Sequence, residues 1–143
     1  MAFDFEYLVW KYDLSTGFVI GYDLEALHAF RELGLKVGGC VSDCKQAQAI
    51  PIGFNVFRHD FTKIVHLSEK PDLILSRRKT VKTNSLVKFM KGAVKAIVVP
   101  PPYTDWVNNF KGKGFRARYD AFAHLGLSVF SRCKGRNEPG VKE

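Results

Sequence analysis

Acidic side chains recur where apolar runs of this 143-residue sequence end. Asp13 follows FEYLVWKY, Asp43 follows LKVGGCVS, and Asp60 follows GFNVFRH. The carboxyl ends of parallel strands meet at one edge of a sheet, and a carboxylate there can accept hydrogen bonds from the hydroxyl groups of a ribose. Glycines after the first run, Gly17 and Gly21, allow the backbone to approach a ligand closely. The pattern predicts a nucleotide-type ligand site at this edge.

Basic residues concentrate in the second part of the chain. Residues 1–60 hold five Lys/Arg and eight Asp/Glu (net −3), whereas residues 61–143 hold seventeen and six (net +11). Two clusters stand out: Arg77, Arg78, Lys79 and Lys82, and then Lys111, Lys113, Arg116 and Arg118. Aromatic residues, among them Phe115, interleave the second cluster. Cations contact phosphates and rings stack on bases, so the clusters predict binding of DNA or RNA; a solvated lysine-rich surface is the alternative.

A third feature is the stretch VKAIVVPPPYTDW, residues 94–106. Three consecutive prolines lack backbone donors, so the apolar strand must end at Pro100. Tyr103 and Asp105 follow directly, which makes them candidates for a substrate loop. A rigid strand exit, with Tyr103 packed on the domain, is the alternative.

Cysteine and histidine spacing raises the question of a metal. Three residues separate Cys40 from Cys44, and His59 and His66 follow, but the six residues between the two histidines are too many for a zinc finger. We expect free thiols and no metal site, because three cysteines, with Cys133 the third, cannot all pair. His59 and His66 have a base or metal role only if the fold brings them into a cleft.

A metal-dependent nuclease is a further alternative. Pro71-Asp72 resembles the opening of the PD-(D/E)xK signature, in which acids hold a divalent ion. No acid-x-lysine triplet follows on the next predicted strand, and the one at residues 43–45 comes earlier in the chain.

The elements that must position these residues alternate. Asp23 caps a predicted helix over residues 24–33, which Gly34 ends. Shorter helices are predicted over residues 45–50, 84–92 and 116–126. Strands are predicted over residues 5–12, 17–21, 35–43, 53–61, 71–76, 93–99 and 127–133. Repeated αβ units imply one α/β domain, residues 1–133, with a mostly parallel sheet and helices on both faces, followed by a flexible basic tail, residues 134–143.

This arrangement resembles the Rossmann-like core of class I S-adenosylmethionine-dependent methyltransferases, especially those that act on DNA bases. The resemblance implies S-adenosylmethionine as cofactor, with Asp13, Gly17 and Gly21 in the cofactor loop. It also implies Asp43 on the ribose and Asp60 on the adenine amine. VVPPPY is similar to the Asp/Asn-Pro-Pro-Tyr loop of amino-methyltransferases, with Pro100 in the first place. Tyr103 would then stack on a flipped base, with Asp105 in the same pocket. Proline supplies no acceptor for the target amine, so a non-catalytic nucleic-acid-binding module stays open.

Composition and length bear on location and partners. The N-terminus carries acids where a signal peptide carries bases, and no apolar run approaches a membrane span. We therefore expect a cytoplasmic protein that does not bind membranes. A chain of 143 residues has little room for a target-recognition domain, so an active enzyme would need a homo-oligomer or a protein partner.

Overall fold

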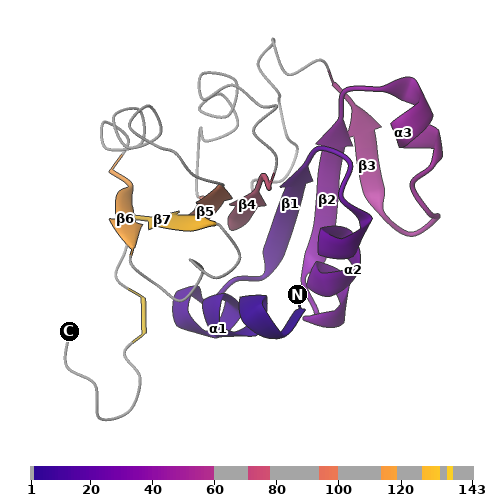
Figure 1. The fold of residues 1–143 in the computed structure, drawn as a ribbon. Helices are drawn as coiled ribbons and strands as arrows, with labels where there is room; N and C mark the ends of the chain where they lie inside the picture. Colours follow the sequence, from indigo (N-terminus) through magenta and orange to yellow (C-terminus); the bar gives the residue numbers. More distant parts are fainter. Residues whose placement is uncertain are drawn as a thin grey trace.

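The computed structural model describes residues 2–59, 71–77, 94–99, 114–118, 127–132 and 135–136. Its strands are β1 (Thr16–Ile20), β2 (Lys36–Val41), β3 (Asn55–Arg58), β4 (Leu73–Leu75), β5 (Ala96–Val99), β6 (Arg116–Arg118) and β7 (Ser128–Ser131). In this part of the chain they form one seven-stranded sheet in the order β3-β2-β1-β4-β5-β7-β6 (Figure 1). The first five are parallel, and β7 is antiparallel to β5 and β6. The mostly parallel, Rossmann-like α/β fold is thus confirmed.

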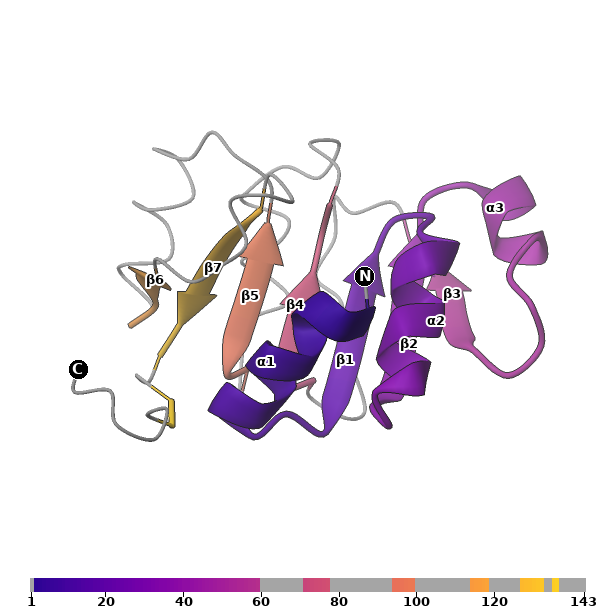
Figure 2. The ribbon, with the colours of Figure 1, turned by 60° about the horizontal axis from the view of Figure 1, so that its bottom comes forward.

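Three helices accompany these strands: α1 (Ala2–Tyr12), α2 (Leu24–Glu32) and α3 (Cys44–Gln48). Helices α1 and α2 lie side by side on one face of the sheet (Figure 2), where the rings of Phe5 and Phe30 meet edge to face with centroids 5.1 Å apart. Both rings belong to a buried cluster that includes Val19, Leu75 and Val98 from the central strands. Burial of this cluster holds the two helices on the sheet.

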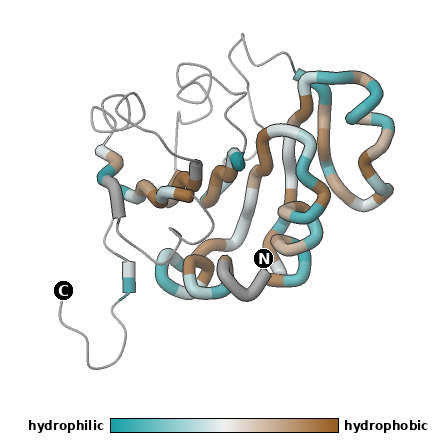
Figure 3. Tube along the Cα trace, viewed as in Figure 1, coloured by the Kyte–Doolittle hydropathy of each residue, from teal (hydrophilic) through white to brown (hydrophobic). Residues whose placement is uncertain are grey.

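The opposite face of the sheet is also apolar. Phe18, Ile74, Ile97 and Phe130 alternate with the residues of that cluster along their strands, and all four are buried. Figure 3 shows the contrast between the hydrophobic β5 and β7 and the hydrophilic α3. Strands buried on both faces are typical of parallel sheets.

Helix α2 forms where the sequence predicts it. The Asp23 carboxylate accepts a hydrogen bond from the Ala26 N–H at 3.2 Å and caps the first turn. Ala26, Ala29 and Phe30 face the core at helical spacing. The helix ends before Gly34, whose φ of +79° suits glycine.

Two predicted elements were wrong. Residues 5–12, predicted as a strand, belong to helix α1, because Phe5, Leu8 and Tyr12 are buried at i, i+3 and i+7 while Trp10 is exposed. That period is helical, and it outweighs the β propensity of the aromatic residues. Residues 116–118, predicted to begin a helix, are instead the edge strand β6, which pairs with β7.

The amino edge of the sheet is held together by Asp72, just before β4. Its carboxylate accepts the Ser15 N–H at 2.8 Å, and its own N–H donates to Thr16 Oγ1 at 2.8 Å. Its carbonyl oxygen accepts the N–H groups of Lys95 and Ala96 at 2.8 and 3.0 Å. One residue therefore fixes the starts of β1, β4 and β5 relative to one another, and we call this arrangement the Asp72 clamp.

Two residues near the C-terminus pack against the end of α1. The Arg136 N–H donates to the Lys11 carbonyl at 2.8 Å, and its guanidinium lies 3.5 Å from an Asp13 carboxylate oxygen. The domain boundary at residue 133 and the flexible tail stay predictions, since residue 134 and residues 137–143 lie outside the described residues. None of the described helices is long and apolar enough to cross a membrane.

Candidate functional site

The strand order reverses direction between β1 and β4, and this reversal marks the candidate site. The chain moves from β1 through α2 to β2 on one side, whereas β4 and β5 lie on the other side of β1. In open α/β sheets ligands bind outside the carboxyl ends of the strands at such a switch point. Neighbouring strand ends are aligned there: Gly21 N–H donates to the Cys40 carbonyl at 2.8 Å and His59 N–H to the Val41 carbonyl at 2.8 Å.

Gly21 ends β1 with its backbone open. Its φ is +95°, and apart from its chain neighbours no heavy atom of the described residues lies within 4 Å of the position that a Cβ would take. A ligand can therefore approach the main chain closely at the carboxyl end of β1.

Asp43 follows β2 and caps the short helix α3. Its Oδ1 accepts the Lys45 N–H at 2.6 Å, which fixes the orientation of the carboxylate. The side chain is exposed, and in the part of the chain that the structure describes Oδ2 has no hydrogen-bond donor. Asp43 therefore offers an acceptor that no described residue uses, and it follows β2 just as Gly21 follows the neighbouring strand β1.

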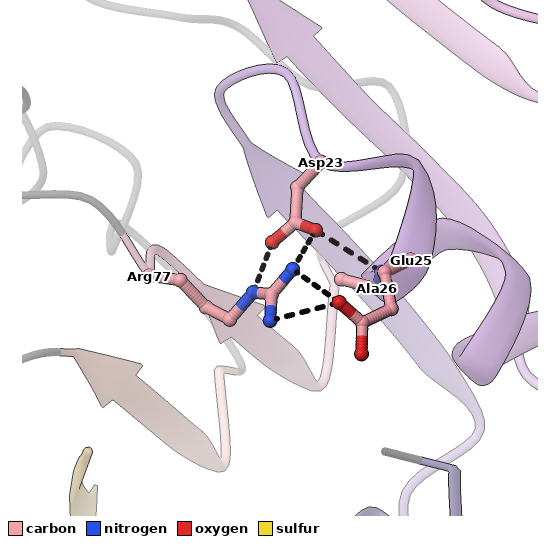
Figure 4. A network of polar contacts seen from close by, with 4 residues as sticks. All are labelled: Asp23, Glu25, Ala26 and Arg77. Atoms are coloured by element: carbon pink, nitrogen blue, oxygen red, sulfur yellow. Dashed lines mark hydrogen bonds and ion pairs between the residues drawn. The ribbon is translucent and has the colours of Figure 1, made fainter. Parts of the chain in front are cut away.

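Asp23, Glu25 and Arg77 form an ion-pair network that joins the ends of β1 and β4 (Figure 4). Arg77 Nε donates to Asp23 Oδ2 at 2.5 Å and Nη2 donates to Asp23 Oδ1. The Nη1 and Nη2 groups also lie 3.5 and 3.4 Å from Glu25 Oε2. The hydrogen bonds that Arg77 donates to Asp23, with the charges of both acids, raise the pKa of Arg77, so the guanidinium stays charged.

The sequence analysis missed this network. It assigns Asp23 only to helix capping and Arg77 to phosphate contact, whereas in the structure Arg77 binds carboxylates and is 27% exposed. The available signal was the acid pair in GYDLE, directly after a strand. This loop follows the first strand of the sheet, which is where Asp13 was expected to lie.

The structure corrects the positions of Asp13 and Gly17. Asp13 follows α1 and precedes β1, so it lies at the amino edge of the sheet, opposite Asp43. Gly17 lies inside β1, where an added Cβ would be 2.7 Å from Phe30 Cδ2, so it makes room for packing rather than forming a cofactor loop. Both errors follow from α1, because taking this helix for the first strand moves the predicted loop one element too early.

Most of the other predicted site residues lie outside the described residues: Asp60, Tyr103, Asp105, Arg78, Lys79, Lys82, Lys111 and Lys113. Arg116 is exposed on the edge strand β6, and Arg118 lies in the same strand. The Arg132 guanidinium stacks 4.6 Å from the Phe115 ring centroid beside them. This edge of the sheet therefore combines cations with an aromatic ring.

The residues considered for a zinc site and for a nuclease metal site lie in different surroundings. Cys40 is buried in β2, where burial raises the pKa of its thiol to about 12, whereas Cys44 is exposed on α3. Among the described residues no group of three or more His, Cys, Asp or Glu side chains could hold a metal ion; His66 lies outside them. Asp72 belongs to the clamp at the amino edge, so it does not meet Asp43 as a nuclease pair would require.

Comparison with models of protein families and with curated proteins found no match. Solved structures do match. One is CalS10, a S-adenosylmethionine-bound amino pentose methyltransferase from Micromonospora echinaspora, with a TM-score of 0.73, 11% identity, and coverage of 92% of this chain and 90% of that one. Streptomyces venezuelae DesVI matches with a TM-score of 0.65 and 12% identity over 90% and 88% of the two chains. The putative RNA methyltransferase PH1948 from Pyrococcus horikoshii matches with a TM-score of 0.59 and 15% identity over 91% of this chain and 82% of that one.

The chain has a class I methyltransferase-like fold. The resemblance expected from the sequence is thereby confirmed for the fold. The low identities explain why no single sequence motif stands out.

Proposed function

We propose that this chain binds S-adenosylmethionine at the carboxyl edge of β1 and β2 and that it acts as a methyltransferase on nucleic acid. The observation that carries the proposal is the juxtaposition of the open Gly21 backbone and the Asp43 carboxylate at the switch point of a methyltransferase-like sheet. The cofactor-bound state of CalS10, which shares the fold, supports it.

The residues present fit the cofactor. Asp43 Oδ2 is available to accept hydrogen bonds from the ribose hydroxyls, and Gly21 lets the backbone lie against the ligand. Asp60, which follows His59 at the end of β3, is proposed to contact the adenine amine. Asp23 lies in the loop after β1, and because both of its oxygens bind Arg77 it positions this side chain rather than contacting the cofactor.

The cofactor supplies a methyl group on a sulfonium centre. The contribution of the chain is to hold the target nucleophile in line with that carbon and to exclude water. We assign the substrate side to Tyr103, which would stack on the target base, and to Asp105 in the same loop. Because this small chain has little room for target recognition, we expect an oligomer or a protein partner in the active state.

Nucleic acid is the proposed substrate because the basic residues concentrate in the second part of the chain. Arg116 and Arg118, on the edge strand β6, are proposed to contact phosphates together with Arg78, Lys79, Lys82, Lys111 and Lys113. A second candidate is a non-catalytic module that binds nucleic acid. The presence of Pro100, which offers no acceptor where amino-methyltransferases have Asp or Asn, favours it.

Calorimetric titration with S-adenosylmethionine tests cofactor binding. We expect the wild-type chain to bind, and Asp43→Ala to lose at least tenfold in affinity because the ribose loses its acceptor. Asp13→Ala is the matched control, since it removes an exposed acid at the opposite edge, and it should bind like the wild type. Absence of binding by the folded wild-type chain would reject the proposal, while salt-sensitive nucleic-acid binding without cofactor binding would favour the non-catalytic module.

A further inference from the structure

The two carboxylates that contact Arg77 do so with different geometry. Asp23 binds the guanidinium through both of its oxygens, which is the bidentate arrangement typical of strong arginine–carboxylate pairs. Glu25 reaches Nη1 and Nη2 with one oxygen, at 3.5 and 3.4 Å, beyond the usual range of about 2.7–3.2 Å for such bonds. Within the described part of the chain, the outer N–H groups of Arg77 are therefore only weakly satisfied.

The two acids also differ in how firmly they are held. The Asp23 side chain is 7% exposed and caps α2 through its bond to Ala26, so it is fixed in place. The Glu25 side chain is 65% exposed and can turn into water at little cost. An exposed pair of this kind contributes little to stability, so another carboxylate can replace it.

The position of Arg77 determines which ligand could reach it. Val19 and Leu75 are the last paired residues of β1 and β4, and Arg77 and Gly21 each follow two residues later at the switch point between these strands. The bonds from Arg77 to Asp23 hold its guanidinium against the loop that follows β1. Figure 4 shows the Glu25 carboxylate at the outer edge of the guanidinium, so a ligand in the loop after β1 that reaches this edge must replace Glu25.

We propose that Arg77 binds the carboxylate at the amino-acid end of the cofactor, and that Glu25 occupies this position until the ligand replaces it. Asp23 keeps the guanidinium oriented in both states, so it is a positioning residue. This inference rests on the proposed function, because it takes S-adenosylmethionine as the ligand. It adds that the ligand-free chain carries an internal competitor for its own cofactor.

The test compares two ligands that differ at one end. S-adenosylmethionine carries the carboxylate, whereas 5′-methylthioadenosine has the same adenosine and sulfur without the amino acid. We expect Glu25→Gln to bind S-adenosylmethionine about two- to fivefold more tightly, as loss of a competing exposed ion pair predicts, and to leave methylthioadenosine binding unchanged. We expect Arg77→Gln to weaken S-adenosylmethionine binding by about tenfold or more, again without affecting methylthioadenosine.

The direction of the Glu25→Gln effect distinguishes competition from general electrostatics. S-adenosylmethionine carries a net positive charge, so removing any nearby acid by itself weakens its attraction to the protein. A gain in affinity has the opposite sign and identifies the competitor. Glu32→Gln, an exposed acid in the last turn of the same helix, is the matched control and should show no gain.

The outcomes separate the two proposals. If the wild-type chain binds neither ligand, the proposed function fails and this inference fails with it. If it binds both, but Glu25→Gln has unchanged or lower affinity for S-adenosylmethionine, only the inference is overturned. Arg77→Gln can destabilise the fold by leaving Asp23 unpaired, so the Glu25→Gln result decides, with circular dichroism confirming that each variant is folded.

Discussion

Gly17 lacks room for a side chain because Phe30 lies directly above it. An added Cβ would stand 2.7 Å from Phe30 Cδ2, and the ring is fully buried and cannot move aside. We expect Gly17→Ala to lower the free energy of unfolding by about 1–3 kcal/mol through overpacking. Gly38→Ala, in the neighbouring strand with its nearest heavy atoms at 3.5 Å, should change it far less. Denaturant titration of both variants checks this, and equal losses would contradict it.

Cys40 makes the stability of the fold sensitive to alkaline pH. Burial raises the pKa of its thiol from the ordinary 9.0 to about 12. Its contribution is complete below pH 9 and is lost as pH rises toward 12, because the unfolded chain releases a proton that the folded chain retains. We expect the free energy of unfolding in this window to fall by up to about 1.4 kcal/mol per pH unit more in wild type than in Cys40→Ala. Parallel profiles would show that the thiol is not the cause.

For single residues, the sequence indicated which kinds of side chain form the site better than it indicated where each of them lies in the fold. Asp43 lies at the end of a strand, as expected, because β2 was placed correctly. Asp13 does not lie at the end of a strand, because it follows residues 5–12, which were predicted as a strand but form part of helix α1. The pairing of Arg77 with Asp23 joins residues 54 positions apart, and such a contact depends on strand order, which no local pattern encodes.

The loop between β1 and α2 depends on Asp23 in two ways, as helix cap and as ion-pair partner. Asp23→Ala removes both, and we expect it to cost about 2–4 kcal/mol in free energy of unfolding. Asp23→Asn keeps an oxygen for the Ala26 N–H but loses the charge, so it should cost about 1 kcal/mol less. Thermal and chemical denaturation measure the difference. Equal losses in the two variants would mean that the cap contributes nothing.

Elements with a clear period and explicit end signals were predictable. Helix α2 has an N-cap residue, a buried face at helical spacing and a glycine after its last turn, and all three signals indicate the same helix. Helix α1 has aromatic residues that favour strands, so only its burial period, read over the whole segment, reveals the helix. Strand β6 is three residues long and forms by pairing with β7, which makes it nearly invisible to local analysis.

The distribution of charge along the sequence predicts which part of the chain would contact the proposed nucleic acid. Arg116 lies on the edge strand β6, whereas Lys36 begins β2 near the other side of the sheet. We expect Arg116→Glu to weaken binding of an oligonucleotide several-fold and to reduce the slope of log affinity against log salt by about one. Lys36→Glu makes the same change in net charge and should have little effect. Fluorescence anisotropy at several salt concentrations measures both, and similar losses would argue against a defined interface at β6.

Strands β1 and β4 are joined by different residues at the two edges of the sheet. The Asp72 clamp fixes the amino edge mainly through main-chain groups. At the carboxyl edge the ends of β1 and β4 are joined by the side chains of Asp23, Glu25 and Arg77. Changes at positions 25 and 77 can therefore alter ligand preference while the strand starts stay aligned. This division makes the chain a candidate scaffold for engineering selectivity toward synthetic methyl donors whose carboxylate has been replaced by another group.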